Sequence, residues 1–364
     1  MSVMPETMKA AVLSELRAPL VVADLVMPST LAVGQVLVKI HVSGICGSQL
    51  GEIDGAKGED RFLPHLLGHE ASGAVLDVGP GVKHVKVGDK VVLHWRKGLG
   101  IEAETPHYTW DGRRVNAGWV TTFSEYTIVS ENRVTAIPAD SDMAVAALFG
   151  CAVTTGFGVV ENNAQVRIGE SVVVFGAGGV GLNIVQAAAL VSAYPIIAVD
   201  LHDNKLELAK QMGATHLINS RSGDARQAIR EIVGAAGIDV FIDNTGQPAI
   251  IEMGYELSKP QGRVTLVGVP RKGNTINIYS LPLHFGKGLS GSHGGEAVPQ
   301  TDIPRYQQLY RAGRIKLKNL ITDSYPLTEI NEALSAMRSG VVAGRCMIYM
   351  GERPADLPSP IPRP

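Results

Sequence analysis

The chain has 364 residues, of which 45% are hydrophobic and 19% are charged, and its formal net charge is −2. These values are typical of a globular protein, and the length favours two domains. The near-neutral charge gives no electrostatic reason to expect nucleic acid or an anionic membrane as a partner.

The cysteines and the apolar runs indicate the cellular compartment in which the protein is expected. Cys46, Cys151 and Cys346 are too few and too scattered for a disulfide framework, which favours a reducing compartment. The first residues, "MSVMPETMKA", lack the pattern of a signal peptide. No uninterrupted apolar run reaches the roughly 18 residues of a membrane span. The sequence therefore predicts a cytoplasmic protein that does not cross a membrane.

The first 150 residues indicate short β-strands. "GQVLVKIHVSGI", "ASGAVLDVG" and "GDKVVLHW" are β-branched runs bounded by glycine, and helical patterns are scarce between them. This texture predicts a barrel-like, mainly antiparallel β domain. The chain returns to mixed texture after about residue 293, with a helical pattern in "YQQLYRAG" and a last strand in "GRCMIYM".

The middle of the chain alternates strand and helix. "SVVVFG" is a continuous apolar run, as expected for a strand buried on both faces, and the helical pattern "GVGLNIVQAAALV" follows it. Strands in "IIAVD", "DVFIDNTG" and "GRVTLVGV" alternate with further helical patterns, which predicts a doubly wound parallel (Rossmann) sheet. The fold class is therefore α/β. The predicted domains are residues 1–152 with 293–364, and residues 153–292.

A nucleotide motif opens this second domain. Gly176, Gly178 and Gly181 have G-x-G-x-x-G spacing, between a predicted strand and a predicted helix. Asp200 ends the next strand, 24 residues after Gly176, near the offset of the carboxylate that binds the adenosine ribose. Asp200 would repel a 2′-phosphate and no arginine follows it directly, so NAD is favoured over NADP. A glycine turn that serves packing alone is the alternative.

Two cysteines and one histidine could bind a metal. Cys46 lies in "SGICGSQL", His69 in "PHLLGHEASG" and Cys151 in "LFGCAVTTGFG". Two thiolates and an imidazole are ligands that zinc prefers, and three protein ligands leave a fourth position open for catalysis. The chain has no short spacing such as CxxC, so each residue taken alone is as consistent with a structural role.

The motifs "GICGS", "GHEASG", "GDKVV", "GCAVTTG", "FGAGGVG", "GAT" and "LVGV" occur in an order and spacing that resemble the zinc-dependent medium-chain dehydrogenases of the alcohol dehydrogenase type. The resemblance extends from about Met8 to Met350. It implies a catalytic, zinc-binding domain that is discontinuous in the chain and an NAD-binding Rossmann domain.

The resemblance also implies roles for individual residues. The catalytic zinc would be held by Cys46, His69 and Cys151, with Glu70 close behind it, and Ser48 would take the proton of the substrate. Trp95 would line the substrate pocket, and Cys346 would be structural. The implied cofactor contacts are Thr155, Gly176, Gly178, Gly179, Val180, Gly181, Asp200, Lys205, Val267 and Arg345, of which Arg345 would reach the pyrophosphate.

Four departures from the family pattern stand out. The segment 94–123 lacks the four cysteines that hold a second, structural zinc in many relatives, so we expect one zinc per chain. This segment could cover the active site, form an interface or be a plain surface loop. Gly51 replaces the histidine that ends the proton relay in many relatives, and Gln49 replaces a carboxylate that orients the ligand histidine. Gly47 replaces a basic pyrophosphate contact.

The resemblance implies a zinc-dependent oxidoreductase that transfers hydride between an alcohol, or its aldehyde or ketone, and NAD. The substrate would be a small molecule, and a homodimer or homotetramer is expected. A polyol, cyclitol or sugar dehydrogenase is the alternative within the family, although such relatives commonly have a glutamate at the position of Cys151. A nucleotide-binding protein without catalysis is the alternative outside enzymes, and it would have no need of Ser48 or of the ligand set.

Overall fold

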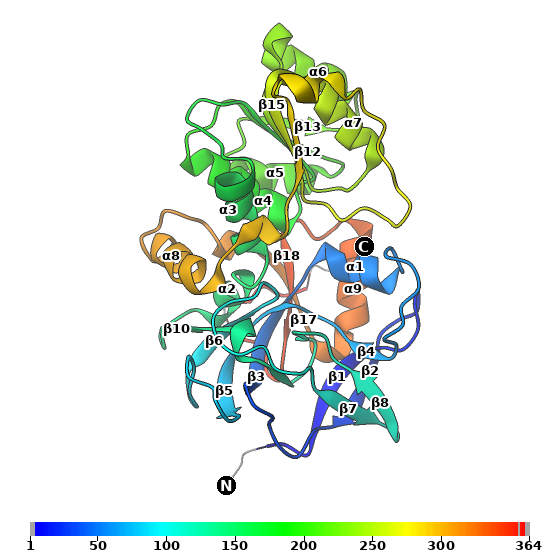
Figure 1. Cartoon of the computed structure of the whole chain (residues 1–364), viewed down its shortest axis with the longest axis vertical. Coiled ribbons are helices and arrows are strands. Elements are labelled where there is room, and N and C mark those ends of the chain that lie inside the picture. The colour runs from blue at the N-terminus through cyan, green and yellow to red at the C-terminus, as the bar shows by residue number, and fades with distance from the viewer. Residues whose placement is uncertain (1–3, 356, 361–364) are drawn as a thin grey trace. The chain divides into compact units, whose positions relative to one another are not determined.

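The computed structural model describes residues 4–355 and 357–360 (Figure 1). The chain divides into two compact units, Met1–Cys151 with Val298–Pro364, and Ala152–Ala297. The domain limits predicted from the sequence, 1–152 with 293–364 and 153–292, stay a prediction. Within the described ranges, no helix is long and apolar enough to cross a membrane.

The first unit contains a closed barrel and an open sheet. In the barrel the strand order is β1-β2-β7-β8-β4, and only the β4–β8 pair is parallel. The barrel strands are β1 (Thr7–Leu13), β2 (Val21–Val26), β4 (His65–Leu66), β7 (His107–Trp110) and β8 (Arg113–Asn116).

The open sheet has the order β10-β6-β5-β3-β18-β17, with β9 pairing to β3. Its strands are β3 (Gln35–Ile45), β5 (Glu70–Val78), β6 (Lys90–His94), β9 (Tyr126–Ser130), β10 (Val134–Ile137), β17 (Ile321–Pro326) and β18 (Arg345–Tyr349). Only the β17–β18 pair is parallel. The prediction of a barrel-like, mainly antiparallel domain is therefore confirmed.

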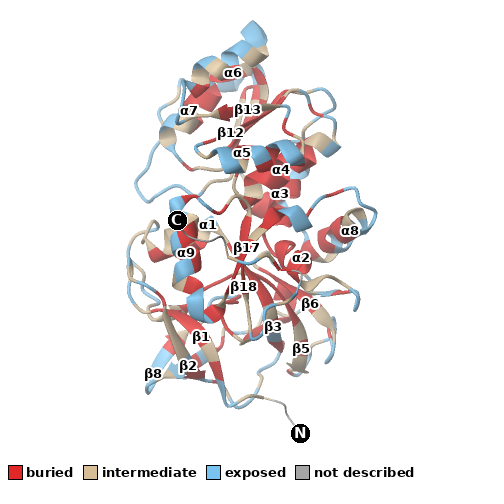
Figure 2. Ribbon diagram, turned by 180° about the vertical axis from the view of Figure 1, so that it is seen from behind, coloured by how far each residue is buried: buried red, intermediate tan, exposed pale blue. Residues whose placement is uncertain are grey.

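The long strand β3 is the centre of this sheet and positions the site. It pairs with β5, β9 and β18, and almost all of its residues are buried (Figure 2). Its buried residues are interrupted only by Lys39, which is exposed, and by His41, which is half-buried. Because β3 ends at Ile45 and β5 begins at Glu70, Cys46 and His69 come from neighbouring strand ends.

The second unit is a six-stranded sheet of parallel strands in the order β13-β12-β11-β14-β15-β16. This is the order of a doubly wound dinucleotide-binding fold, in which ligands bind at the carboxyl ends of the strands where the order reverses. That prediction is also confirmed. The strands are β11 (Val172–Phe175), β12 (Ile196–Asp200), β13 (His216–Asn219), β14 (Ile238–Asp243), β15 (Ser258–Leu266) and β16 (Gly288–Gly291).

Helices connect these strands and cover the sheets. In the first unit they are α1 (Gly47–Ile53), α2 (Met143–Leu148), α8 (Pro299–Arg311) and α9 (Ile330–Ser339), and in the second α3 (Ala152–Gly158), α4 (Gly179–Leu190), α5 (Asp203–Met212), α6 (Ala225–Val233) and α7 (Pro248–Leu257). The core of the second unit joins Val173, Ile197 and Phe241 of the sheet to Ile229 of α6 and Tyr255 of α7.

Candidate metal centre and nucleotide site

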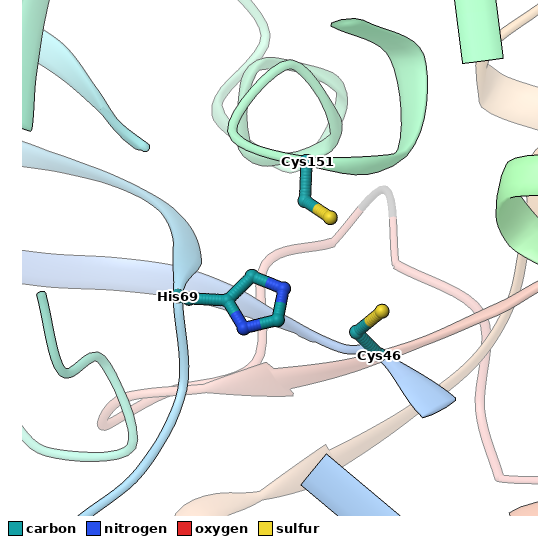
Figure 3. Close-up of side chains that lie close together, drawn as sticks. All are labelled: Cys46, His69 and Cys151. Carbon is teal, nitrogen blue, oxygen red and sulfur yellow. The ribbon is translucent and has the colours of Figure 1, made fainter. Parts of the chain in front are cut away.

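Cys46, His69 and Cys151 converge in the first unit (Figure 3). Their ligand atoms all lie within 4.8 Å of one another. A zinc ion binds such ligands at about 2.0–2.3 Å, which requires them to lie this close to one another. His69 Nε2 points toward the two sulfurs and is buried without a hydrogen-bond partner among the described residues (Figure 3). The donor set and this orphaned nitrogen fit a zinc ion with one open position.

Each ligand is fixed by its local backbone. Cys46 is the N-cap of α1, and His69 directly precedes β5. Cys151 follows Gly150, where a side chain would meet the backbone oxygen of Leu93 at 2.3 Å and Cα of Glu70 at 2.8 Å. Only glycine permits this approach, so Gly150 brings Cys151 to the amino end of β5, directly after His69, and to the carboxyl end of β6.

The three ligand groups influence one another's ionisation. The neighbouring Cys151 thiol and the charge of Arg345 hold the pKa of Cys46 well below its usual value, although burial opposes this. The pKa of Cys151 is correspondingly raised by Cys46 and by burial. Burial alone would lower the pKa of His69, but contact with Cys46 and the charge of Glu70 raise it. Without a metal, Cys46 is therefore the thiol of the pair that ionises first.

Glu70 and Arg345 lie behind this cluster. Both side chains are buried, and the guanidinium forms an ion pair with the carboxylate and also donates to the backbone oxygen of Ile45. Glu70 directly follows the ligand His69, and the role predicted for it stays a prediction. The contacts of Arg345 in the structure all lie within the first unit, and its predicted contact with a pyrophosphate stays a prediction.

Ser48 and Trp95 lie at the edges of the cluster. Ser48 is in the first turn of α1, and its Oγ is buried without a hydrogen-bond partner in the described part of the chain. A serine that only satisfied a local turn would show such a bond. Trp95 directly follows β6, whose last residue His94 pairs with Glu70, so Trp95 leaves the sheet beside His69. The Trp95 ring packs against the hydrophobic core of the open sheet, and the roles suggested for Ser48 and Trp95 stay predictions.

The glycine motif forms a tight turn between β11 and α4. Gly176 has φ +96°, a conformation that favours glycine, and a side chain at Gly181 would meet the backbone oxygen of Gly176 at 2.0 Å. Gly179 and Val180 form the first turn of α4, with backbone N–H groups that no helical carbonyl can reach. A side chain at Gly178 would meet none of the chain's described atoms within 4 Å, so this face of the turn is open to a ligand.

The other predicted cofactor residues lie in or near this sheet. Asp200 ends β12 and accepts hydrogen bonds from the backbone N–H groups of Ala177, Leu201 and His202, so it joins the glycine turn to the adjacent strand. Lys205 is half-buried in α5, and Val267 follows β15. Thr155 is in α3, with Oγ1 buried and without a partner among the residues that the structure describes.

One residue of the nucleotide site was missed by the sequence analysis. Asn244 follows β14, and a side chain at Gly176 would meet its Cβ at 3.3 Å. Both polar atoms of its carboxamide are buried without a partner across the described ranges. Its place at the carboxyl end of a strand next to the glycine turn makes it a candidate cofactor contact. That place was the only available signal, because the amide itself is not part of the motif.

The cysteine-free segment 94–123 is anchored by two buried charged side chains. The buried carboxylate of Glu131 accepts hydrogen bonds from the backbone N–H groups of Lys83, His84 and Ile101. The buried guanidinium of Arg133 donates to Glu102 at 3.1 Å and to the backbone oxygen of Trp95. The later part of the segment forms β7 and β8 and completes the barrel. These side chains hold the segment for which the sequence left three roles open: a cover of the active site, an interface or a surface loop.

Family models match two parts of the chain. Residues 32–139 match "Alcohol dehydrogenase GroES-like domain", and residues 179–311 match "Zinc-binding dehydrogenase". An S-(hydroxymethyl)glutathione dehydrogenase of Paracoccus denitrificans is 32% identical over 94% of this chain and 99% of its own length. An alcohol dehydrogenase class-3 of Cereibacter sphaeroides is 32% identical over 91% and 97%.

Solved structures agree with these matches. Benzyl alcohol dehydrogenase of Acinetobacter calcoaceticus has a TM-score of 0.85 at 30% identity, covering 95% of this chain and 100% of the other. An alcohol dehydrogenase zinc-binding domain protein of Burkholderia ambifaria has a TM-score of 0.83, also at 30% identity, covering 95% and 99%. The likeness therefore spans both units.

Proposed function

Because the chain belongs to the zinc-dependent medium-chain alcohol dehydrogenases, which transfer hydride between an alcohol and NAD, we propose that Cys46, His69 and Cys151 hold its catalytic zinc. The observation that carries this proposal is the convergence of the three ligand atoms within 4.8 Å, with His69 Nε2 buried and unpartnered among the described residues. The comparisons favour the alcohol dehydrogenase reading over the polyol alternative.

When bound, zinc acts as a Lewis acid that lowers the pKa of the substrate hydroxyl, and NAD accepts the hydride. The protein then has to remove a proton and exclude water. Among the described residues, Ser48 Oγ is the unpartnered hydroxyl nearest in sequence to a ligand, and we assign it the proton of the substrate. Trp95 is the aromatic wall of the alcohol site, and its exit from the sheet beside His69 supports this.

The second unit binds the cofactor through residues of several elements. The glycine turn from Gly176 to Gly181 and the N-terminus of α4 receive the pyrophosphate. Asp200 accepts the hydroxyls of the adenosine ribose, with Lys205 beside it. Thr155, Val267 and the newly identified Asn244 contact the remainder of the dinucleotide. The fit rests on unpartnered polar atoms at Thr155 and Asn244 within the described residues, and on the open face of Gly178.

Substitution of single cysteines tests the metal assignment. Cys46→Ser and Cys151→Ser should each lose zinc and lose NADH formation, whereas the buried Cys346→Ser should keep both. The measurements are elemental analysis and turnover with a panel of primary alcohols, benzyl alcohol, polyols and S-(hydroxymethyl)glutathione. Full zinc content in Cys46→Ser, or turnover of polyols alone, would contradict the proposal.

We also propose a homodimer or homotetramer. Exposed apolar side chains at Tyr279, Leu281, Leu283 and Phe285 precede β16, which is the last strand of its sheet and pairs only with β15 in the described chain. Exposed apolar residues beside an unpaired strand edge are typical of an interface. Phe285→Asp should shift the mass measured by light scattering to that of a smaller species, and an unchanged mass would place the interface elsewhere.

A cytoplasmic location is the last part of the proposal. All three cysteines are free in the structure, and two of them are assigned to the metal, which requires reduced thiols. Cell fractionation with a tagged chain should recover the protein with cytoplasmic markers, and recovery from an oxidising compartment would contradict this.

A further inference from the structure

The buried carboxamide of Gln49 connects two of the metal ligands. Its Oε1 accepts a hydrogen bond from the backbone N–H of Cys46 at 2.8 Å, and its Nε2 contacts Nδ1 of His69. The side chain is almost completely buried, with 1% of the residue exposed, so water does not compete for these contacts. Gln49 therefore has one hydrogen-bonding partner at each end of its amide.

The contact with His69 depends on where the imidazole carries its proton. A neutral imidazole has one N–H and one acceptor nitrogen. If Gln49 Nε2 donates to Nδ1, the proton of His69 lies on Nε2, which is the nitrogen that points toward the two sulfurs (Figure 3). A nitrogen that carries a proton has no lone pair to offer a metal. The arrangement seen for Gln49 therefore favours the tautomer of His69 that does not bind zinc.

Binding of zinc through Nε2 moves the proton to Nδ1, where it faces the N–H of Gln49. Rotating the amide by half a turn lets Oε1 accept from Nδ1–H, but Nε2 then faces the N–H of Cys46. A carboxamide has one acceptor and one donor end, so it satisfies only one of these two N–H groups in the metal-loaded site. A carboxylate would accept from both.

We propose that Gln49 lowers the zinc affinity of this site by stabilising the metal-free tautomer of His69, which makes the metal exchangeable. Gln49 touches neither substrate nor cofactor and acts through His69, so it is a positioning residue. This inference rests on the proposed zinc ligands. It goes beyond them, because it states that glutamine in place of a carboxylate at position 49 lowers the affinity for zinc.

The isosteric variant Gln49→Glu tests the proposal. Zinc affinity, measured by competition with a chromophoric chelator in the absence of alcohol and NAD, should increase by about 10–100-fold, the range found for partners of metal ligands. Gln308→Glu, on the exposed face of α8, adds the same charge away from the site and should leave the affinity unchanged. An affinity of Gln49→Glu equal to or weaker than that of the wild type would overturn the proposal.

The tautomer can be measured directly and needs no substitution. In the ¹⁵N spectrum of metal-free wild type at mildly alkaline pH, His69 should carry its proton on Nε2, and in metal-free Gln49→Glu it should carry it on Nδ1. A wild-type His69 protonated on Nδ1 would overturn the proposal even if the variant fails to fold. If the wild type binds no zinc through the two cysteines, the proposed function itself fails, which is a different result.

Discussion

Glu70 and Arg345 form a buried ion pair with two contacts. Arg345 Nε lies 2.9 Å from Glu70 Oε1, and Nη2 donates to Oε2 at 3.2 Å. The side chains of Glu70 and Arg345 are 0% and 4% exposed. Each therefore compensates the buried charge of the other. Because Arg345 begins β18 and Glu70 begins β5, the pair joins the two flanks of β3 immediately behind Cys46.

Removal of one partner should therefore be costly. Glu70→Gln leaves the guanidinium buried without its anion, and we expect the free energy of unfolding of the first unit to fall by about 3–5 kcal/mol. Denaturant unfolding followed by tryptophan fluorescence measures this unit selectively, since Trp95, Trp110 and Trp119 all belong to it. The double variant Glu70→Gln/Arg345→Met should recover part of the loss. A double variant less stable than Glu70→Gln alone would show that the ion pair is not the cause.

Metal content and the anchoring of segment 94–123 give a second prediction. We expect one zinc per chain, since the Glu131 and Arg133 side chains hold this segment through hydrogen bonds. Chelation should remove activity without exposing the segment to protease. Glu131→Gln should keep the zinc but lower the free energy of unfolding by about 2 kcal/mol, because hydrogen bonds to a charged acceptor are lost. Two equivalents of zinc in pure protein would contradict this prediction.

The fold could be predicted because each of its elements has a local signal. The apolar run of β11 and the glycines from Gly176 to Gly181 occupy one short stretch, and the alternation of strand and helix predicts a parallel sheet. The ligand set came from a resemblance in which short motifs around Cys46, His69 and Cys151 keep their order. In these cases the information lies within a few residues of the position concerned.

The features of the site that the sequence did not predict depend on contacts between residues far apart in the chain. Glu70 meets Arg345 across 275 positions, and Glu131 binds N–H groups of residues 83, 84 and 101, which no local pattern reports. The role of the Gln49 amide can be inferred only when the positions of both of its partners, Cys46 and His69, are known. The resemblance implied that Arg345 contacts a pyrophosphate, and only the structure shows that it faces the carboxylate of Glu70.

Cofactor preference depends on Asp200. Asp200→Gly removes the acceptor for the ribose hydroxyls and the repulsion of a 2′-phosphate, so the ratio of kcat/KM for NADP to that for NAD should rise by roughly 10–100-fold. Absolute rates with both cofactors should fall, because Asp200 also holds the N–H of Ala177 in the glycine turn. The exposed Glu207→Gln on α5 removes a charge elsewhere and should leave the ratio unchanged. A wild type that prefers NADP would contradict the role of Asp200.

The buried His94 should make the free energy of unfolding depend on pH in the acidic range. Burial lowers its pKa from 6.5 to about 4, and it is held neutral between the Arg96 carbonyl and the Thr135 hydroxyl. The unfolded chain binds a proton at this histidine below about pH 6.5 and the folded chain does not, so stability falls as the pH drops, by about 3 kcal/mol once pH 4 is reached. In His94→Gln the dependence of unfolding on pH should be flatter over this interval. Equal slopes in His94→Gln and in the wild type would rule out His94 as the source.

Ser48 is the residue on which the proton transfer depends. Its Oγ is buried, lies two residues after the ligand Cys46, and has no hydrogen-bond partner within the described ranges, so it is available to the substrate hydroxyl. Gly51, one turn further along α1, offers no imidazole to carry the proton onward. Ser48→Ala should therefore lower kcat on the order of 10²-fold or more, the lower range of general acid–base assistance. Zinc content and NAD affinity should stay unchanged, because serine is neither a metal ligand nor part of the glycine turn. Ser48→Thr, which keeps the hydroxyl, should retain more activity than Ser48→Ala. Near-normal turnover in Ser48→Ala at full zinc occupancy would instead route the proton through ordered water.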